Sequence, residues 1–93
     1  MVRYHIVIHG DVQGVGFRYY TQKNAFACGV KGWVRNKLDG SVEIDAEGSE
    51  TNIAFFLGAL KRGSRYSSVG STDIRKTDEL MNYRTFDIED DEW

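Results

Sequence analysis

Two helical patterns that are apolar on one face only flank a β-hairpin pattern, and this order limits the folds open to the chain. The first helical pattern covers residues 17–28 and the second covers residues 53–60, with apolar side chains three or four positions apart. Residues 30–36 and 42–47 alternate in polarity as strands do, and an Asp-Gly turn at residues 39–40 joins them. Because each helix has a single apolar stripe to bury, we expect both helices to cover the same face of one sheet.

Two further strand patterns complete the order of elements. Residues 3–9 alternate in polarity before the first helix, and Phe86 and Ile88 mark a short strand near the end of the chain. The order predicts an α+β fold, a ferredoxin-like split βαβ sandwich (βαββαβ plus a short C-terminal strand) with two helices on one face of an antiparallel sheet. We expect it to form a single domain over residues 1–93.

The region after the second helix is the least clear part of the pattern. Val69 and Ile74 lie five positions apart, so they face the same side of a strand only if that strand contains a bulge or a break. The path of the segment from Gly63 to Asp78 therefore stays open. The fold by itself does not define a function, because this architecture hosts many unrelated activities.

Composition excludes several kinds of site. The chain has 93 residues, of which 41% are hydrophobic, enough for one domain with its own core. Cys28 is the only cysteine, which excludes an intrachain disulfide and a zinc site of several thiolates, and its place on the first apolar stripe predicts a small core residue. The net charge is −2, and no long apolar run or signal-peptide pattern is present. We therefore expect a soluble, cytoplasmic protein with no membrane or nucleic-acid partner.

A glycine-rich segment joins the first strand to the first helix. It reads Gly10-Asp11-Val12-Gln13-Gly14-Val15-Gly16-Phe17-Arg18, and three glycines in seven positions let the main chain curl tightly. Main-chain N–H groups in such a loop, next to the positive end of a helix dipole, form a cradle for an anion. Arg18 adds a guanidinium suited to phosphate oxygens. The alternative is a flexible glycine turn followed by an unrelated arginine.

A second motif, Gly32-Trp33-Val34-Arg35-Asn36, ends the first strand of the hairpin. In the split βαβ topology this end lies near the loop that follows the first strand of the chain. Asn36 would then bring to the same site an amide that accepts and donates hydrogen bonds without titrating. Its alternative is an ordinary turn asparagine beside Asp-Gly. The occurrence of both motifs together favours a site.

Together the two motifs resemble the signatures of the acylphosphatase family. The second continues through Lys37-Leu38-Asp39-Gly40-Ser41-Val42, both occur in the order and at the separation found in the family, and the resemblance covers nearly the whole chain. Residues 63–68 depart from the family because they lack the proline common there. The resemblance implies an acylphosphatase, a hydrolase acting on acid anhydrides that cleaves small-molecule acyl phosphates to carboxylate and inorganic phosphate. We expect no metal, because no carboxylate cluster lies near the loop and Asp11 alone is not a magnesium site, and we expect no cofactor.

The resemblance also implies a role for each site residue. Arg18 matches the arginine that binds the phosphoryl group, and Asn36 matches the asparagine that orients the attacking water. The loop that holds the phosphate through its main-chain amides matches Asp11, Val12, Gln13, Gly14 and Val15. The chemistry agrees, because a carboxylate leaves readily and the protein has only to position water and stabilise charge on the phosphoryl oxygens.

Other sites and functions are less well supported. His5 and His9 would share a strand face about 13 Å apart, too far for one zinc ion, and the loop lacks the Gly-Lys-Ser/Thr ending of a nucleotide-binding P-loop. One rival is a non-catalytic ferredoxin-like module that binds phosphate or RNA, but the aromatic patterns typical of RNA recognition are not seen. Another is an accessory domain of a larger modification enzyme. The sequence ends at Trp93, which favours a free-standing enzyme, expected to be a monomer.

Overall fold

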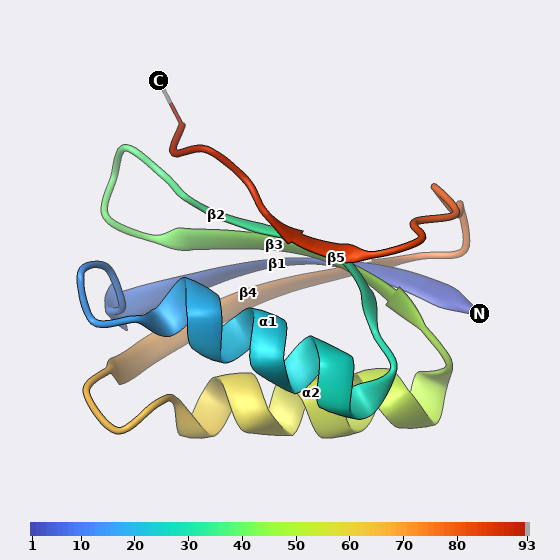
Figure 1. Cartoon of the computed structure of the whole chain (residues 1–93), viewed down its shortest axis with the longest axis horizontal. Helices are drawn as coiled ribbons and strands as arrows, with labels where there is room; N and C mark the ends of the chain where they lie inside the picture. Colours follow the sequence, from blue (N-terminus) through green and yellow to red (C-terminus); the bar gives the residue numbers. More distant parts are fainter. Residues whose placement is uncertain (93) are drawn as a thin grey trace.

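The computed structural model describes residues 1–92 and contains a five-stranded sheet with two helices on one face (Figure 1). The strands are ordered β4-β1-β3-β2-β5 across the sheet. In chain order the elements are β1 (Val2–Asp11), α1 (Phe17–Cys28), β2 (Lys31–Asn36), β3 (Val42–Gly48), α2 (Glu50–Arg62), β4 (Ser68–Thr77) and β5 (Phe86–Ile88). This arrangement confirms the predicted ferredoxin-like α+β fold and the short strand near the end of the chain.

The central strand pairs are antiparallel, whereas the last strand is parallel to its neighbour. β1 pairs antiparallel with β3 and β4, and β2 pairs antiparallel with β3. β5 pairs in parallel with β2, with Asp87 opposite Trp33. The sheet is therefore mixed and not purely antiparallel as expected. The reason is the direction of the strands. β4 runs antiparallel to β2, so a chain that reverses after β4 and then pairs with the free edge of β2 runs parallel to β2.

β4 contains the bulge that the spacing of Val69 and Ile74 requires. The register between β1 and β4 shifts after His9, which leaves Gly70 without an opposite residue. Val69 packs against the core, and Ile74 lies on the same side of the sheet but is exposed because β4 forms an edge. The segment of residues 63–78 thus leaves α2 and becomes this edge strand.

The apolar core lies between the helices and the sheet, and it fixes where α1 begins. Phe17, Phe56 and Phe86 are its largest buried side chains, and the rings of Phe56 and Phe86 meet edge to face with centroids 5.9 Å apart. Phe17 is the first residue of α1 and is almost fully buried. Its packing anchors the exit of the glycine-rich loop against the core.

The other face of the sheet carries charged side chains. The alternation in β3 places Glu43, Asp45 and Glu47 on this face, yet none of them is more than 9% exposed. Part of the reason is the segment of residues 78–85, which crosses this face. Three of its main-chain N–H groups donate to the carboxylate of Glu47, those of Met81, Asn82 and Tyr83.

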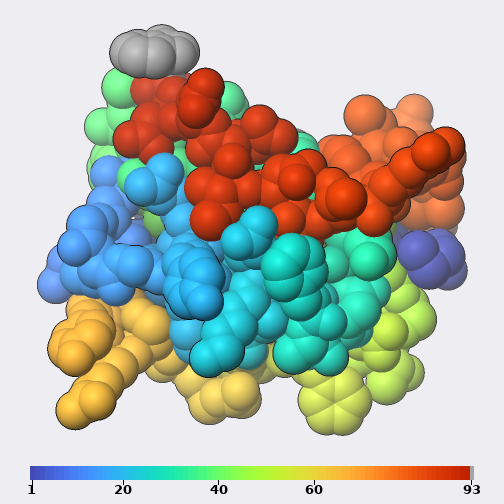
Figure 2. All heavy atoms as spheres, in the orientation of Figure 1, coloured from blue at the N-terminus to red at the C-terminus, as the bar shows by residue number. Residues whose placement is uncertain are grey.

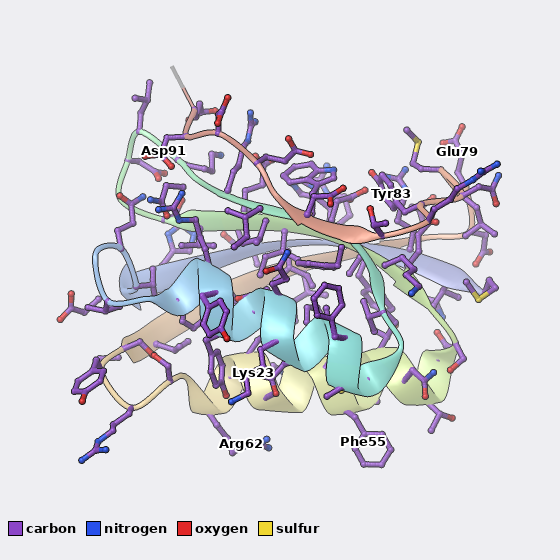
Figure 3. All side chains as sticks on the ribbon, viewed as in Figure 1. Lys23, Phe55, Arg62, Glu79, Tyr83 and Asp91 are labelled. Atoms are coloured by element: carbon purple, nitrogen blue, oxygen red, sulfur yellow. The ribbon has the colours of Figure 1, made fainter. Side chains whose placement is uncertain are left out.

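Asp45 lies at the centre of these charges. Its carboxylate accepts hydrogen bonds from the Tyr83 hydroxyl at 2.6 Å and from Nη1 of Arg3 at 3.1 Å. The two ring nitrogens of His5 lie 3.3 Å from Asp45 and 2.9 Å from Glu43. Figure 3 labels Tyr83 on this side of the sheet, away from the helices. We call this set the open-face cluster, and it comprises Arg3, His5, Trp33, Arg35, Glu43, Asp45, Glu47 and Tyr83.

Candidate active site

The glycine-rich loop curls between the end of β1 and the start of α1. Gly14 and Gly16 have φ angles of 73° and 78°, in the left-handed region that other residues resist. Gly16 is also the N-cap of α1, and no side chain caps the helix there. Within residues 1–92, none of the N–H groups of residues 13–19 donates a hydrogen bond to another protein atom. The loop therefore presents free donors at the positive end of a helix dipole, which suits an anion.

Gln13 connects this loop to the β2–β3 hairpin. Its Nε2 donates to the main-chain oxygens of Lys37 at 2.8 Å and Ser41 at 2.7 Å. The hairpin turn is itself held by Asp39, whose carboxylate accepts from the hydroxyl of Ser41 at 2.5 Å and from its N–H at 2.9 Å. These two hydrogen bonds lower the pKa of the Asp39 carboxyl, the hydroxyl contributing most. Loop and turn thus support one another next to the end of β2.

Asn36 is the last residue of β2 and lies beside the loop. It is only 8% exposed, and its buried Oδ1 accepts no hydrogen bond from the described residues. A buried carbonyl oxygen without a donor costs about 1–3 kcal/mol, so such an atom commonly marks the place of a bound water or ligand. Asn36 therefore offers an acceptor that the protein leaves open.

These groups meet at a hollow of about 220 Å³, which we call the loop crevice. It lies between the loop, the first turn of α1, the end of β2 and β5, and its lining residues are Val12, Gly14, Gly16, Phe17, Arg18, Tyr19, Asn36 and Ile88. Four of the predicted site residues are therefore brought together, namely Val12, Gly14, Arg18 and Asn36. The other three do not line the crevice: the main chain of Asp11 pairs with β4, the side chain of Gln13 donates to the hairpin and Val15 packs against the core.

Four lining residues are absent from the sequence-based set, namely Gly16, Phe17, Tyr19 and Ile88, although Gly16 and Phe17 belong to the glycine-rich segment itself. Tyr19 directly follows Arg18, so its position next to the glycine-rich motif could have indicated that it lies near the site. Ile88 comes from β5, at the opposite end of the chain, and reaches the crevice because β5 lies beside β2 and contacts α1. No local pattern indicates that contact.

Arg18 is the second residue of α1, and its guanidinium meets the C-terminal end of the chain. Its Nη1 lies 2.9 Å from Oδ1 of Asp91. Figure 2 shows the last residues, in dark red, lying against the first part of α1, in light blue. The Arg18 side chain is 37% exposed, and its remaining N–H groups have no partner among residues 1–92. The sequence patterns do not predict this ion pair, because the two residues are 73 positions apart.

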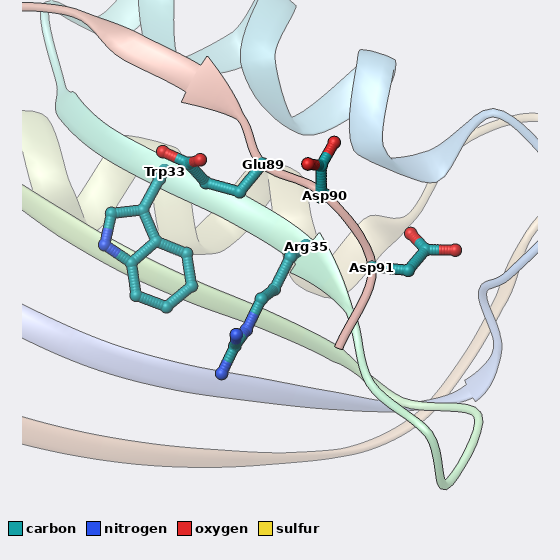
Figure 4. A pocket seen from close by; sticks show the side chains of 5 residues that line it. All are labelled: Trp33, Arg35, Glu89, Asp90 and Asp91. Carbon is teal, nitrogen blue, oxygen red and sulfur yellow. The ribbon is translucent and has the colours of Figure 1, made fainter. Parts of the chain in front are cut away.

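A second hollow, of about 400 Å³, lies on the other side of the C-terminal segment (Figure 4). Trp33, Arg35, Glu89, Asp90 and Asp91 line it. The guanidinium of Arg35 lies 5.5 Å from the centroid of the Trp33 ring, and its Nε donates to a Glu43 oxygen at 2.6 Å. Since this arginine is already engaged and carboxylates surround it, the loop crevice is the better site for an anion.

The described residues do not form an obvious metal centre. No group of three or more His, Cys, Asp or Glu side chains within residues 1–92 is arranged to hold a metal ion. The histidines lie apart, His5 in the open-face cluster and His9 with its Nε2 2.9 Å from Asp73. Over the same residues, no helix combines the length and the apolar character needed to cross a membrane.

Comparison with known proteins agrees with this geometry. The acylphosphatase family profile matches residues 4–88. The curated acylphosphatase of Bacillus velezensis is 47% identical over 88 residues, which make up 95% of this chain and 98% of that protein. The crystal structure of acylphosphatase from Bacillus subtilis matches with a TM-score of 0.94 at 42% identity, covering 96% of this chain and 99% of that one.

The likeness extends to a small part of a larger protein. Full-length HypF, in a phosphate- and nucleotide-bound crystal form, matches 98% of this chain with a TM-score of 0.86 and 28% identity, but only 12% of HypF is covered. Acylphosphatases are hydrolases that act on acid anhydrides, so the comparisons confirm the predicted class of enzyme. The family profile and the relatives cover nearly all of the sequence, and the chain belongs to the acylphosphatase family.

Proposed function

We propose that this chain hydrolyses small-molecule acyl phosphates at the loop crevice, with no metal ion, and that Arg18 and Asn36 are its catalytic residues. The observation that carries the proposal is the set of unpaired groups in one place. Main-chain N–H groups of the loop, a guanidinium with free N–H groups and a buried amide oxygen without a donor all border the same hollow. A phosphoryl group and a water molecule would satisfy them together.

The loop and Arg18 bind the phosphoryl group. The N–H groups of residues 13–19 and the dipole of α1 stabilise its negative oxygens, and the proposed phosphate loop is Asp11, Val12, Gln13, Gly14 and Val15. Only Nη1 of Arg18 is engaged by Asp91, so the guanidinium keeps other donors for phosphoryl oxygens. Because these donors are held before the substrate arrives, they stabilise charge on the equatorial oxygens without reorganising.

Asn36 orients the attacking water. Its Oδ1 accepts a hydrogen bond from the water, which aims a lone pair of the water oxygen at phosphorus. The new P–O bond forms as the bond between phosphorus and the acyl oxygen breaks, and the electron pair of that bond leaves with the carboxylate. An amide is a poor base, so the proton passes to a phosphoryl oxygen or to solvent. No step in this scheme requires a metal-bound water.

Release of inorganic phosphate from benzoyl phosphate in the presence of EDTA tests the proposal. The expected result is steady release that EDTA does not change and that inorganic phosphate inhibits competitively. Hydrolysis that disappears with EDTA and returns with a divalent cation would overturn the metal-independent mechanism. Binding of phosphate, or retention of RNA on a filter, without any hydrolysis would instead support the non-catalytic module.

The remaining expectations concern the state of the protein. A single domain over residues 1–93, a monomer, a cytoplasmic location and the lack of a nucleic-acid partner all stay predictions. The single cysteine and the net charge of −2 support the last two. Sedimentation equilibrium at micromolar concentration checks the monomer, and a dimer mass would contradict it.

A further inference from the structure

The segment Glu89–Glu92, four successive acidic residues that we call the acidic tail, is fixed beside the loop crevice. The N–H of Glu89 donates to the main-chain oxygen of Val34 at 2.9 Å, and the N–H of Glu92 donates to that of Asn36 at 2.9 Å. The side chain of Glu92 also accepts the N–H of Leu38 at 3.1 Å. The acidic tail therefore continues along β2 after β5 ends and stops next to the hairpin turn.

The acidic tail borders a hollow that continues from the loop crevice. This hollow, of about 480 Å³, is lined by Arg18, Ile88, Glu89, Asp90 and Asp91. It shares Arg18 and Ile88 with the loop crevice, so a group attached to a phosphoryl held by Arg18 can extend into it. Asn36, which orients the attacking water in the proposed mechanism, lines the loop crevice but not this hollow. The hollow is therefore placed to hold the departing acyl group and not the attacking water.

Most of the charged groups that line this hollow are negative. Three of its five lining residues are carboxylates, and its single cation, Arg18, is the group that binds the phosphoryl. Figure 4 shows Glu89 extending toward Trp33, whereas Asp90 and Asp91 point away from that ring. Charges within about 8 Å of one another still interact at physiological salt, so an acyl group in the hollow lies within the field of these carboxylates. Its apolar surface is supplied by Ile88, which is 41% exposed.

We propose that this hollow is the acyl-group subsite and that two of its acidic residues, Asp90 within it and Glu89 at its edge on the Trp33 side, determine its specificity. They select against acyl phosphates whose acyl group carries a negative charge and favour uncharged or ammonium-bearing acyl groups. A carboxylate on the acyl group is repelled by the acidic tail, an uncharged ring or alkyl group lies on Ile88, and an ammonium group is attracted. This inference rests on the proposed function of the loop crevice.

Three substrates of similar shape test the selectivity, namely benzoyl phosphate, 4-carboxybenzoyl phosphate and 4-(aminomethyl)benzoyl phosphate. In the unmodified protein at low salt, kcat/KM is expected to be about 3- to 10-fold lower for the carboxylate and higher for the ammonium compound than for benzoyl phosphate. The double variant Glu89→Gln/Asp90→Asn should bring the three values within about twofold of each other, and 0.5 M NaCl should act in the same direction.

The matched control removes the same charge at the far end of the molecule. Asp78 and Glu79 are exposed, and Figure 3 shows Glu79 at the opposite end from Asp91. The variant Asp78→Asn/Glu79→Gln should keep the selectivity of the unmodified protein, because only the position of the removed charge differs. Equal rates on all three substrates in the unmodified protein, or selectivity that survives neutralisation of Glu89 and Asp90, would overturn the inference.

A binding measurement separates this inference from the proposed function. Benzylphosphonate and 4-carboxybenzylphosphonate cannot be hydrolysed as acyl phosphates, and calorimetric titration gives their affinities. Weaker binding of the carboxylate that disappears in Glu89→Gln/Asp90→Asn supports the subsite even if no acyl phosphate is turned over, a result that would overturn only the proposed function. Turnover of benzoyl phosphate together with equal binding of both phosphonates would overturn the subsite alone.

Discussion

The two polar regions of this molecule differ in how completely their groups are paired. The open-face cluster lies on one side of the sheet, and its carboxylates meet arginine, histidine, tyrosine and main-chain N–H partners from several elements. The loop crevice lies at the end of β2, between the glycine-rich loop and the first turn of α1. There the N–H groups of residues 13–19 and Oδ1 of Asn36 have no partner within residues 1–92.

This difference separates structural polar groups from functional ones. Burying a charge without a partner is costly, so the partners around Asp45 make its burial tolerable and attach the segment of residues 78–85 to the sheet. The crevice keeps its polar groups unpaired, which costs folding stability and leaves them free for a ligand. Substitutions in the cluster should therefore change stability, and substitutions in the crevice should change catalysis.

Arg18→Ala is expected to have the largest effect on activity. Removing a preorganised donor to the phosphoryl oxygens should lower kcat/KM for benzoyl phosphate by at least about 100-fold. The melting temperature should change little, because the ion pair with Asp91 is exposed and contributes little stability.

Arg3→Ala is the control for Arg18→Ala within the open-face cluster. Arg3 donates to Asp45, which is 2% exposed, so its loss should lower the free energy of unfolding and leave kcat/KM within about twofold. Near-full activity of Arg18→Ala would remove the distinction between the two regions. So would a fall of kcat/KM well beyond twofold in Arg3→Ala at a temperature at which that variant is still folded.

Asn36→Ala should have the next largest effect, and it should act mainly on kcat. The amide aims water only for the reaction, so kcat is expected to fall about 10- to 100-fold, while inhibition by inorganic phosphate stays within about threefold. Thermal unfolding should show no loss of stability, since the substitution removes a buried oxygen that has no donor.

Asn24→Ala is the control for Asn36→Ala. Nδ2 of Asn24 donates to the main-chain oxygen of Tyr20 at 2.8 Å, so this asparagine is paired and lies outside the crevice. Its kcat should match that of the unmodified protein. An Asn36→Ala enzyme that lost phosphate binding but kept kcat would contradict the role of Asn36 in orienting water.

Gln13→Ala tests a paired group that supports the crevice. Without the bonds to Lys37 and Ser41, the loop is no longer held against the hairpin, and kcat/KM should fall about tenfold. The change should come more from KM than from kcat, because the side chain of Gln13 holds the phosphate loop in place and does not itself contact the substrate.

Gln22→Ala is the matched variant for Gln13→Ala. Nε2 of Gln22 donates to the main-chain oxygen of Phe86 at 2.9 Å, a bond of the same kind that connects α1 to β5. It should keep the KM of the unmodified protein. An equal rise in KM for both variants would show that the effect of Gln13 is general loosening and not support of the loop.

The regular elements could be predicted from sequence because they depend on local pattern, and the closeness of Arg18 and Asn36 could be predicted from the topology of those elements. The apolar stripe of α1 and the alternation of β2 are visible over a few residues, and the positions of Arg18 and Asn36 follow from the fold that these elements define. The ion pair of Arg18 with Asp91 depends on where the acidic tail lies after β5 joins β2. No local pattern carries that information.

The open-face cluster shows a second limit of sequence patterns. Alternation in β3 correctly places Glu43, Asp45 and Glu47 on one face, and such a face is commonly exposed in an antiparallel sheet. Here it is buried because the segment of residues 78–85 brings Tyr83 and main-chain donors over it. That segment contains no helix or strand before β5, so no periodic pattern in the sequence predicts its path across the sheet.

Tyr83→Phe should have the smallest effect, confined to stability and dependent on pH. The hydroxyl of Tyr83 donates to Asp45 and accepts from Nε1 of Trp33 at 3.1 Å, so its loss should lower the free energy of unfolding by about 1 kcal/mol at pH 7, or roughly 4–8 °C in melting temperature for a chain of this size. The control Tyr66→Phe, at an exposed side chain, should change neither value.

The pH dependence of Tyr83→Phe gives the sharper measurement. Burial, followed by the hydrogen bond to Asp45, raises the pKa of Tyr83 to about 12, above the ordinary value of 10.0 for a tyrosine. Below pH 10 both folded and unfolded chains keep the phenol proton, so the stabilisation is complete. Between pH 10 and 12 the unfolded chain loses the proton first, and the stability of the unmodified protein falls as pH rises. Phenylalanine has no proton to lose, so urea unfolding at a series of pH values should show the difference between the two proteins narrowing through this window. A constant difference would mean that the phenol ionises equally in both states, and the open-face cluster would then not be the closed, fully paired region that the comparison requires.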